Sequence, residues 1–140
     1  MRWLLLLCAP ILMAQTPPPL VPEGIHRDAD GPSELCGFSA PDVPSLERSI
    51  ATDPTFIEEN STTEYRVFNR ESDFVQFVFP RPGRHKFPMA TCRKVTSASG
   101  GSFITRDLYC GGSRTECDRI FLQFKELDES VRRMLKGDAS

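Results

Sequence analysis

The chain has 140 residues, which is enough for one domain and too few for an array of several. Its 17 basic and 19 acidic side chains give a net charge of −2. Nucleic-acid-binding domains usually carry a clear excess of basic residues, so we expect no nucleic acid partner.

The first fourteen residues have the order of a secretory signal peptide. Arg2 supplies a positive charge, residues 3–13 carry none, and Ala14 is a small residue at the expected cleavage position. The apolar run is well short of the roughly 20 residues that cross a bilayer as a helix. We therefore expect residues 1–14 to be removed and the mature chain, without a transmembrane segment, to be secreted or periplasmic.

Residues 15–34 are rich in proline, which lacks an amide donor and disfavours helix in the residue before it. This composition predicts a flexible arm, followed by a single domain over residues 35–140. A short helical turn is expected near residues 44–50, where Leu46 and Ile50 are spaced to face one way.

From residue 62 onward the pattern is that of four short strands. Residues 62–69 alternate apolar and polar side chains, which is typical of a strand with one solvated face. Residues 74–79 are aromatic and β-branched on both faces and predict the most buried strand. Strands over residues 89–96 and 103–110 follow, joined by a glycine-containing hairpin connection at residues 97–102. The sequence predicts an antiparallel meander sheet.

The C-terminal segment predicts one long helix. Ser113 and Glu116 have the spacing of a capping box, and apolar residues then recur at steps of three and four from Ile120 through Phe124, Leu127 and Val131. An amphipathic helix of this length is expected to cover one face of the sheet, which gives an α+β domain.

Five cysteines are present, and Cys8 is lost with the signal peptide. An even set in an oxidising compartment predicts two disulfides; the cysteines are Cys36, Cys92, Cys110 and Cys117. Zinc is the competing use, but the short Cys-x-x-Cys pairs typical of zinc sites are absent, so we expect no metal.

The pairing of the four cysteines leaves two alternatives. If the hairpin turns around Gly100–Gly101, Cys92 lies opposite Cys110, and Cys36 then pairs with Cys117; we prefer this arrangement. The alternative joins Cys110 to Cys117 across the intervening glycines and Cys36 to Cys92.

The most unusual stretch is the loop at residues 80–88, in which three prolines and a glycine stiffen four residues that can be cationic. These four are Arg81, Arg84, His85 and Lys86. A stiff loop holds guanidinium groups at low entropic cost, which suits carboxylate or phosphate recognition. The simpler interpretation is a solvated turn whose charges keep the adjoining strands from aggregating.

Charge is unevenly distributed along the chain. Residues 15–64 hold ten acids and two bases, whereas residues 74–114 hold seven bases and one acid. Either the two parts lie against each other, or the basic segment faces an anionic partner.

An aromatic strand that runs into Pro82-Gly83-Arg84-His85-Lys86-Phe87-Pro88 resembles a group of small exported bacterial proteins of unknown function. Those proteins often carry Pro-Gly-His-Pro-x-His-Pro at this place, and here Arg84 and Phe87 replace both motif histidines. The similarity covers roughly residues 64–135 as a strand–loop–strand–helix order. It implies export and a related fold, and no activity.

Little in the sequence predicts catalysis, and we assign no catalytic residue and expect no cofactor. His85 with an acid such as Glu64 and a nearby arginine could perform acid–base work on a phosphodiester. The sequence therefore predicts an exported binding or interaction module that contacts an anionic envelope polymer or a protein through the loop at residues 80–88. The alternatives are a hydrolase of anionic polymers and a structural envelope component.

Overall fold

The computed structural model describes residues 25–26, 34–98 and 100–137. The expected signal peptide (1–14) lies outside these residues, and so does most of the expected arm (15–34). Within the arm, Ile25–His26 forms the short strand β1, which pairs in parallel with a later strand. At these two residues, therefore, the chain is part of the sheet.

The described part of the chain contains one six-stranded sheet in the order β1-β6-β5-β4-β3-β2. Five strands form an antiparallel meander: β2 (Ile57–Glu58), β3 (Tyr65–Arg70), β4 (Val75–Pro80), β5 (Met89–Ala98) and β6 (Gly101–Cys110). A 3₁₀ turn, η1 (Glu71–Asp73), connects β3 to β4. The predicted α+β meander is confirmed, with β2 as an additional edge strand that its two exposed residues did not reveal.

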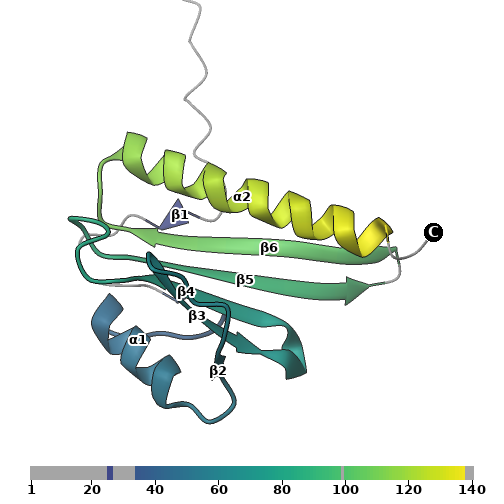
Figure 1. Cartoon of the computed structure of the whole chain (residues 1–140), viewed down its shortest axis with the longest axis horizontal. Helices are drawn as coiled ribbons and strands as arrows, with labels where there is room; N and C mark the ends of the chain where they lie inside the picture. The colour runs from purple at the N-terminus through teal and green to yellow at the C-terminus, as the bar shows by residue number, and fades with distance from the viewer. Residues whose placement is uncertain (1–24, 27–33, 99, 138–140) are drawn as a thin grey trace, which may run out of the picture.

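Helices lie on both sides of the sheet (Figure 1). The long helix α2 (Arg114–Gly137) runs along β6 at one side, and the short helix α1 (Val43–Thr52) lies at the other. Asp42 caps the N-terminus of helix α1, and its carboxylate accepts a hydrogen bond from the amide of Ser45 at 2.7 Å. The predicted helical turn near residues 44–50 is thus a ten-residue helix.

Two apolar clusters follow from the alternation of side chains across the sheet. Leu46 and Ile50 of α1 pack with Phe77 and Phe79 of β4 on one face. On the other face, α2 packs against a second cluster that includes Val78, Met89, Leu108 and Ile120. Strand β4 supplies buried residues to both clusters, as its sequence predicted.

The disulfides join Cys36 to Cys92 and Cys110 to Cys117, so the preferred prediction is wrong and the alternative pairing holds. The reason is the hairpin register, in which Cys92 pairs with Asp107 and Cys110 with Met89. A register shift by an odd number of residues turns the side chains to the opposite face. The Cys92 side chain consequently lies in the cluster with α1, and that of Cys110 in the cluster with α2.

The buried face of helix α2 also differs from the apolar stripe that the sequence predicts. Ser113 and Glu116 form the predicted capping box, with Ser113 N donating to Glu116 Oε2 at 3.0 Å and Glu116 N donating to Ser113 Oγ at 3.3 Å. Leu127, however, is 58% exposed, and the next residue, Asp128, is only 3% exposed. A buried carboxylate therefore occupies the helix face on which the sequence pattern placed a leucine.

Candidate functional site

The loop at residues 80–88 folds back on itself at a tight turn. Arg84 N donates to Arg81 O at 3.1 Å, and Gly83 at the centre of the turn has φ +83°, a conformation that favours glycine. Arg81 N in turn donates to Glu64 O at 2.8 Å, which fastens the start of the loop beside β3. The turn therefore fixes the direction in which residues 84–87 leave it.

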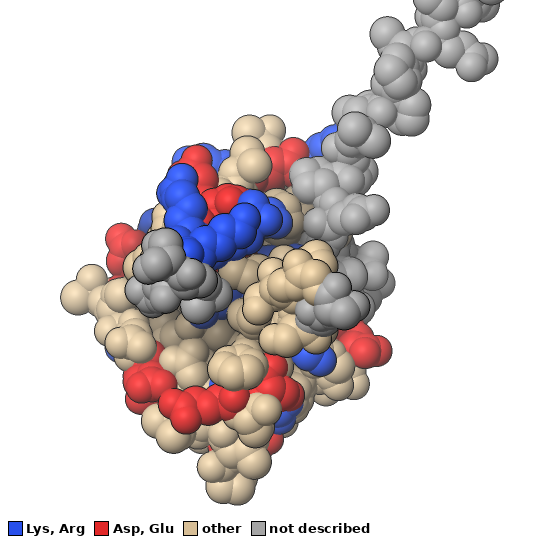
Figure 2. Space-filling model, turned by 90° about the vertical axis from the view of Figure 1, so that its right-hand side faces the viewer, with Lys and Arg blue, Asp and Glu red and all other residues tan. Residues whose placement is uncertain are grey.

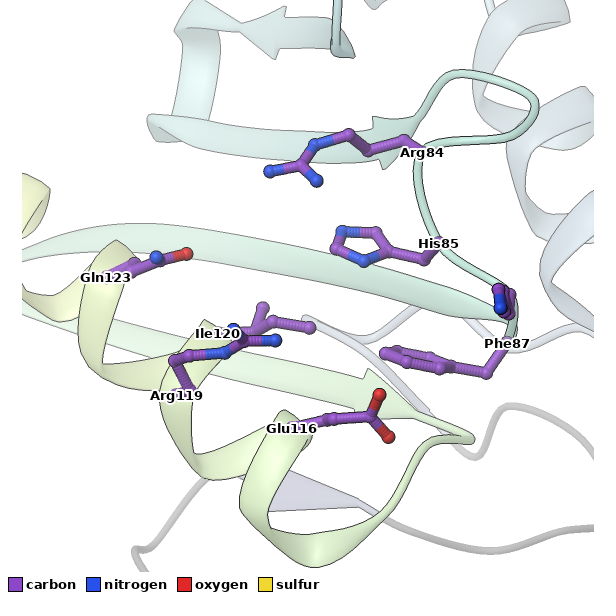
Figure 3. A pocket seen from close by; sticks show the side chains of 8 residues that line it. Arg84, His85, Phe87, Glu116, Arg119, Ile120 and Gln123 are labelled. Atoms are coloured by element: carbon purple, nitrogen blue, oxygen red, sulfur yellow. The ribbon is translucent and has the colours of Figure 1, made fainter.

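A cleft of about 320 Å³ lies between this loop and the first turns of α2. Figure 3 shows Arg84, His85 and Phe87 entering it from the loop, and Glu116, Arg119, Ile120 and Gln123 facing them from the helix. Lys86 completes the lining. The helix residues share one face because they are spaced by three or four positions.

Three of the four residues predicted for the binding loop line this cleft, namely Arg84, His85 and Lys86. Arg81 does not line it, because its Nε donates to Thr62 O at 2.7 Å. Arg119, Glu116 and Gln123 were not predicted. Their helical spacing was visible in the sequence, but nothing in the sequence placed that helix face beneath the loop.

The cleft carries more positive than negative charge. Arg84, Lys86 and Arg119 contribute three cations, against one carboxylate, Glu116, in the lining. Arg84 also contacts Glu64 outside the lining, with an Nε to Oε2 distance of 3.4 Å and both side chains substantially exposed. Exposed pairs of this kind are weak, so Arg84 remains available to a ligand.

His85 is held by aromatic neighbours. Its Nε2 lies 3.2 Å from the Tyr65 hydroxyl, and its ring stacks on Phe87 with a centroid distance of 5.3 Å. Burial, followed by the charges of Arg84 and Arg119, lowers the pKa of His85, although Glu116 and Glu64 oppose this shift. Burial raises the pKa of Tyr65. Both groups are therefore uncharged near neutral pH, and the cations of the cleft are Arg84, Lys86 and Arg119.

Gly112, which has no Cβ atom, leaves room for the ring of Phe87. A Cβ atom there would lie 2.8 Å from the nearest ring atom of Phe87. Phe87 is thus packed between the backbone of Gly112 and the imidazole of His85. The segment that leads into α2 consequently fixes the position of a residue on the loop side of the cleft.

A second polar cluster is buried between α2 and the sheet. Arg106 Nε donates to Asp128 Oδ2 and Nη2 to Oδ1, both at 2.6 Å, and Nη1 donates to Thr91 Oγ1 at 3.0 Å. Arg93 Nη1 lies 3.7 Å from Asp128 Oδ1. Because the side chain of Arg106 is 2% exposed, this cluster is closed to ligands and stabilises the contact between helix and sheet.

The acidic and basic segments lie against each other through the apolar cluster around α1 and the disulfide between Cys36 and Cys92. Among the described residues, the basic segment pairs with the acidic segment only through Arg84 and Glu64. Arg93, Arg106 and Arg114 instead pair with acids of α2. The two segments are therefore not held together mainly by their opposite charges.

The end of the molecule at which α2 terminates shows no surface of a single sign. Figure 2 shows Lys and Arg gathered on the upper part of that face and Asp and Glu in an arc along its lower part. Both signs of charge therefore lie side by side on this end of the molecule. The cleft beside the loop at residues 80–88 is accordingly the stronger candidate for binding an anion.

The described residues contain no group of three metal-ligating side chains, and neither described helix is long and apolar enough to span a bilayer. Comparison with protein-family models, with curated proteins and with solved structures finds no significant match. Fold and cleft together define a small α+β protein with two disulfides and a cationic cleft. The resemblance to small exported bacterial proteins stays a prediction.

Proposed function

We propose that this protein is an exported binding module whose cleft between the loop at residues 80–88 and α2 holds an anionic group. The observation that carries the proposal is the lining of one cleft by Arg84 and Lys86 from the loop and by Arg119 from the helix. Cations supplied by two separate elements and held around one concavity suit recognition of an anion. The fourth charged lining residue, Glu116, accepts hydrogen bonds from Ser113 through one of its carboxylate oxygens, Oε2.

Export is supported by two observations. Two disulfides indicate an oxidising compartment outside the cytoplasm. The charged, apolar and small-residue order of residues 1–14 is that of a secretory signal peptide. We infer a secreted or periplasmic mature protein.

The proposal is tested with dextran sulfate as a generic anionic polymer. Substituting Arg84, Lys86 and Arg119 together by serine should weaken binding by about 10- to 100-fold at low salt, since each exposed charge pair contributes up to about 1 kcal/mol. Binding of the native protein should also weaken as salt is raised, because the charges are solvent-exposed. Isothermal titration calorimetry provides the measurement.

Two controls separate the cleft from charge in general. Arg81→Ser removes one cation from the same loop outside the cleft. Serine substitutions at Arg132, Arg133 and Lys136 remove three exposed charges from the far end of α2. Both variants should bind within about threefold of the native protein; a loss equal to that of the cleft variant would contradict the proposal.

The second candidate function is a hydrolase acting on an anionic polymer, and the position of His85 favours it. An imidazole whose pKa is lowered is neutral near pH 7 and can act as a general base. Cleavage of the bound polymer by the native protein, and its loss in His85→Gln, would establish this activity. A structural envelope component would instead remain fully functional without the cleft cations.

A further inference from the structure

The cleft contains more than positive charge. Glu116 points into it from the first turn of α2, and Gln123 follows two turns later (Figure 3). Glu116 Oε2 accepts hydrogen bonds from Ser113 N at 3.0 Å and Ser113 Oγ at 2.8 Å. These hydrogen bonds, with smaller effects of Arg119 and His85, hold the pKa of Glu116 below its ordinary value, so its carboxylate stays ionised.

An ionised carboxylate in an anion site affects selectivity. It repels a ligand that presents only negative charges, and it accepts hydrogen bonds from a ligand that also carries donors. The amide of Gln123 can donate and accept. The lining therefore matches a molecule that carries both an acidic group and hydroxyl groups.

The size and the apolar part of the cleft favour the same kind of ligand. Its volume of about 320 Å³ is that of a small-molecule pocket and exceeds what one carboxylate or sulfate group fills. Phe87, which is half-buried, adds apolar surface to the lining, against which the C–H groups of a sugar ring can pack. The acidic side chains of a protein partner, those of Asp and Glu, carry no hydroxyl groups beside the charge.

We propose that the cleft binds an acidic sugar residue of a carbohydrate, with the acidic group at Arg84, Lys86 and Arg119 and ring hydroxyls at Glu116 and Gln123. This inference rests on the proposed anion-binding function and specifies its ligand class. A uronate and a sulfated sugar share the chemistry that the cleft recognises. A protein partner with an acidic segment is the competing ligand.

The test compares four probes of matched length by calorimetry at one salt concentration. Oligogalacturonate and a sulfated galactose oligomer carry both charge and hydroxyls; poly-glutamate carries charge without hydroxyls, and a neutral maltooligosaccharide carries hydroxyls without charge. At least one acidic oligosaccharide should bind about tenfold more tightly than poly-glutamate, because its hydroxyls add hydrogen bonds to Glu116 and Gln123. The neutral oligosaccharide should bind more weakly than either acidic one.

Two variants test the residues that give this preference. Glu116→Gln keeps a capping-box residue at this position, so the start of α2 should remain folded. It removes the repulsion, and poly-glutamate should therefore bind more tightly while the preference for the acidic oligosaccharide shrinks to the few fold that Gln123 contributes. Gln123→Ala, at an exposed position, should weaken only the oligosaccharide, by a few fold.

The results separate the two proposals. Equal binding of poly-glutamate and both acidic oligosaccharides would overturn the sugar assignment and leave the anion site intact. An unchanged preference in Glu116→Gln would overturn the role of Glu116 and with it this inference. Failure of the native protein to bind any of the charged probes would overturn the proposed function itself.

Discussion

Two arginines share one buried carboxylate where α2 meets the sheet. Asp128 receives two hydrogen bonds from the Arg106 guanidinium, and Arg93 approaches the same carboxylate. The Arg106 guanidinium also lies 4.8 Å from the centroid of the Phe124 ring. Burial lowers the pKa of Arg93, and the charge of the neighbouring Arg106 lowers it further.

Removing the carboxylate should cost more than removing the whole pair. We expect Asp128→Ala to lower the free energy of unfolding by about 3–5 kcal/mol, because it leaves Arg106 buried without a counter-charge. The double variant Arg106→Met with Asp128→Leu should recover most of this loss, since Phe124 offers an apolar surface to pack against. Urea unfolding measures both; a single variant that loses under 1 kcal/mol would contradict the account.

The pKa of His85 reports directly on the cleft. Burial and the neighbouring arginines lower this pKa, so we expect an imidazole titration below pH 6.5 in the folded protein. Arg84→Ser should shift the midpoint upward, whereas Arg81→Ser, which removes a cation outside the cleft, should leave it nearly unchanged. NMR titration of the His85 ring protons measures the midpoints. A lowering of the midpoint in Arg84→Ser would contradict this cause.

The same shift sets the sign of a pH effect on stability. The pKa of His85 is lower in the folded chain than in the unfolded chain, so the unfolded chain binds the proton more readily. The contribution of His85 to stability is therefore present above the unfolded pKa of about 6.5 and is lost as the pH falls from that value through the lower folded pKa. His85→Gln should flatten this part of the stability profile.

At the scale of elements, sequence periodicity predicted the strands better than the helix phase. Phe77, Val78 and Phe79 are buried on both faces of β4, as an unbroken apolar run implies. In α2 the pattern could not separate Leu127 from Asp128 as the inward residue. An aspartate is normally exposed, and its burial becomes favourable here through Arg106 of β6 and Arg93 of β5, both distant in sequence.

Two aliphatic positions on α2 test its orientation. Ile120 is 2% exposed and Leu127 is 58% exposed. Ile120→Ala should lower the free energy of unfolding by about 2–5 kcal/mol, because it empties part of the core. Leu127→Ala should change it by less than about 0.5 kcal/mol, as is usual at the surface. Thermal unfolding of the two variants compares them, and equal losses would place Leu127 in the core.

Some residues of the candidate site could be predicted from the sequence, and others could not. Arg84, His85 and Lys86 are consecutive, so their proximity required no knowledge of the fold. Arg119 and Glu116 joined them only because the disulfide between Cys110 and Cys117 and the Gly111–Gly112 segment bring the start of α2 beside the loop. Contacts between elements that are distant in sequence depend on the tertiary fold, which periodicity does not report.

At the scale of the whole molecule, each disulfide fastens a different layer to the sheet. Cys36, at φ +50° in the tight turn between Leu35 and Phe38, links the segment before α1 to β5. Cys117 links the first turn of α2 to the end of β6. One bridge therefore holds the α1 layer, and the other lies beside the cleft.

Removing the first disulfide should therefore affect mainly stability, and removing the second should affect mainly binding. The two bridges span 56 and 7 residues, so the chain-entropy argument gives about 4 kcal/mol for the first and about 2.5 kcal/mol for the second. Replacing Cys36 and Cys92 by alanine should thus cost more stability and, at 15 °C, leave dextran sulfate binding within about twofold. Replacing Cys110 and Cys117 should cost less stability yet weaken binding severalfold, because Glu116 and Arg119 flank Cys117 on α2. Urea unfolding and calorimetry on both variants measure the two effects, and weaker binding in the first variant than in the second would contradict this expectation.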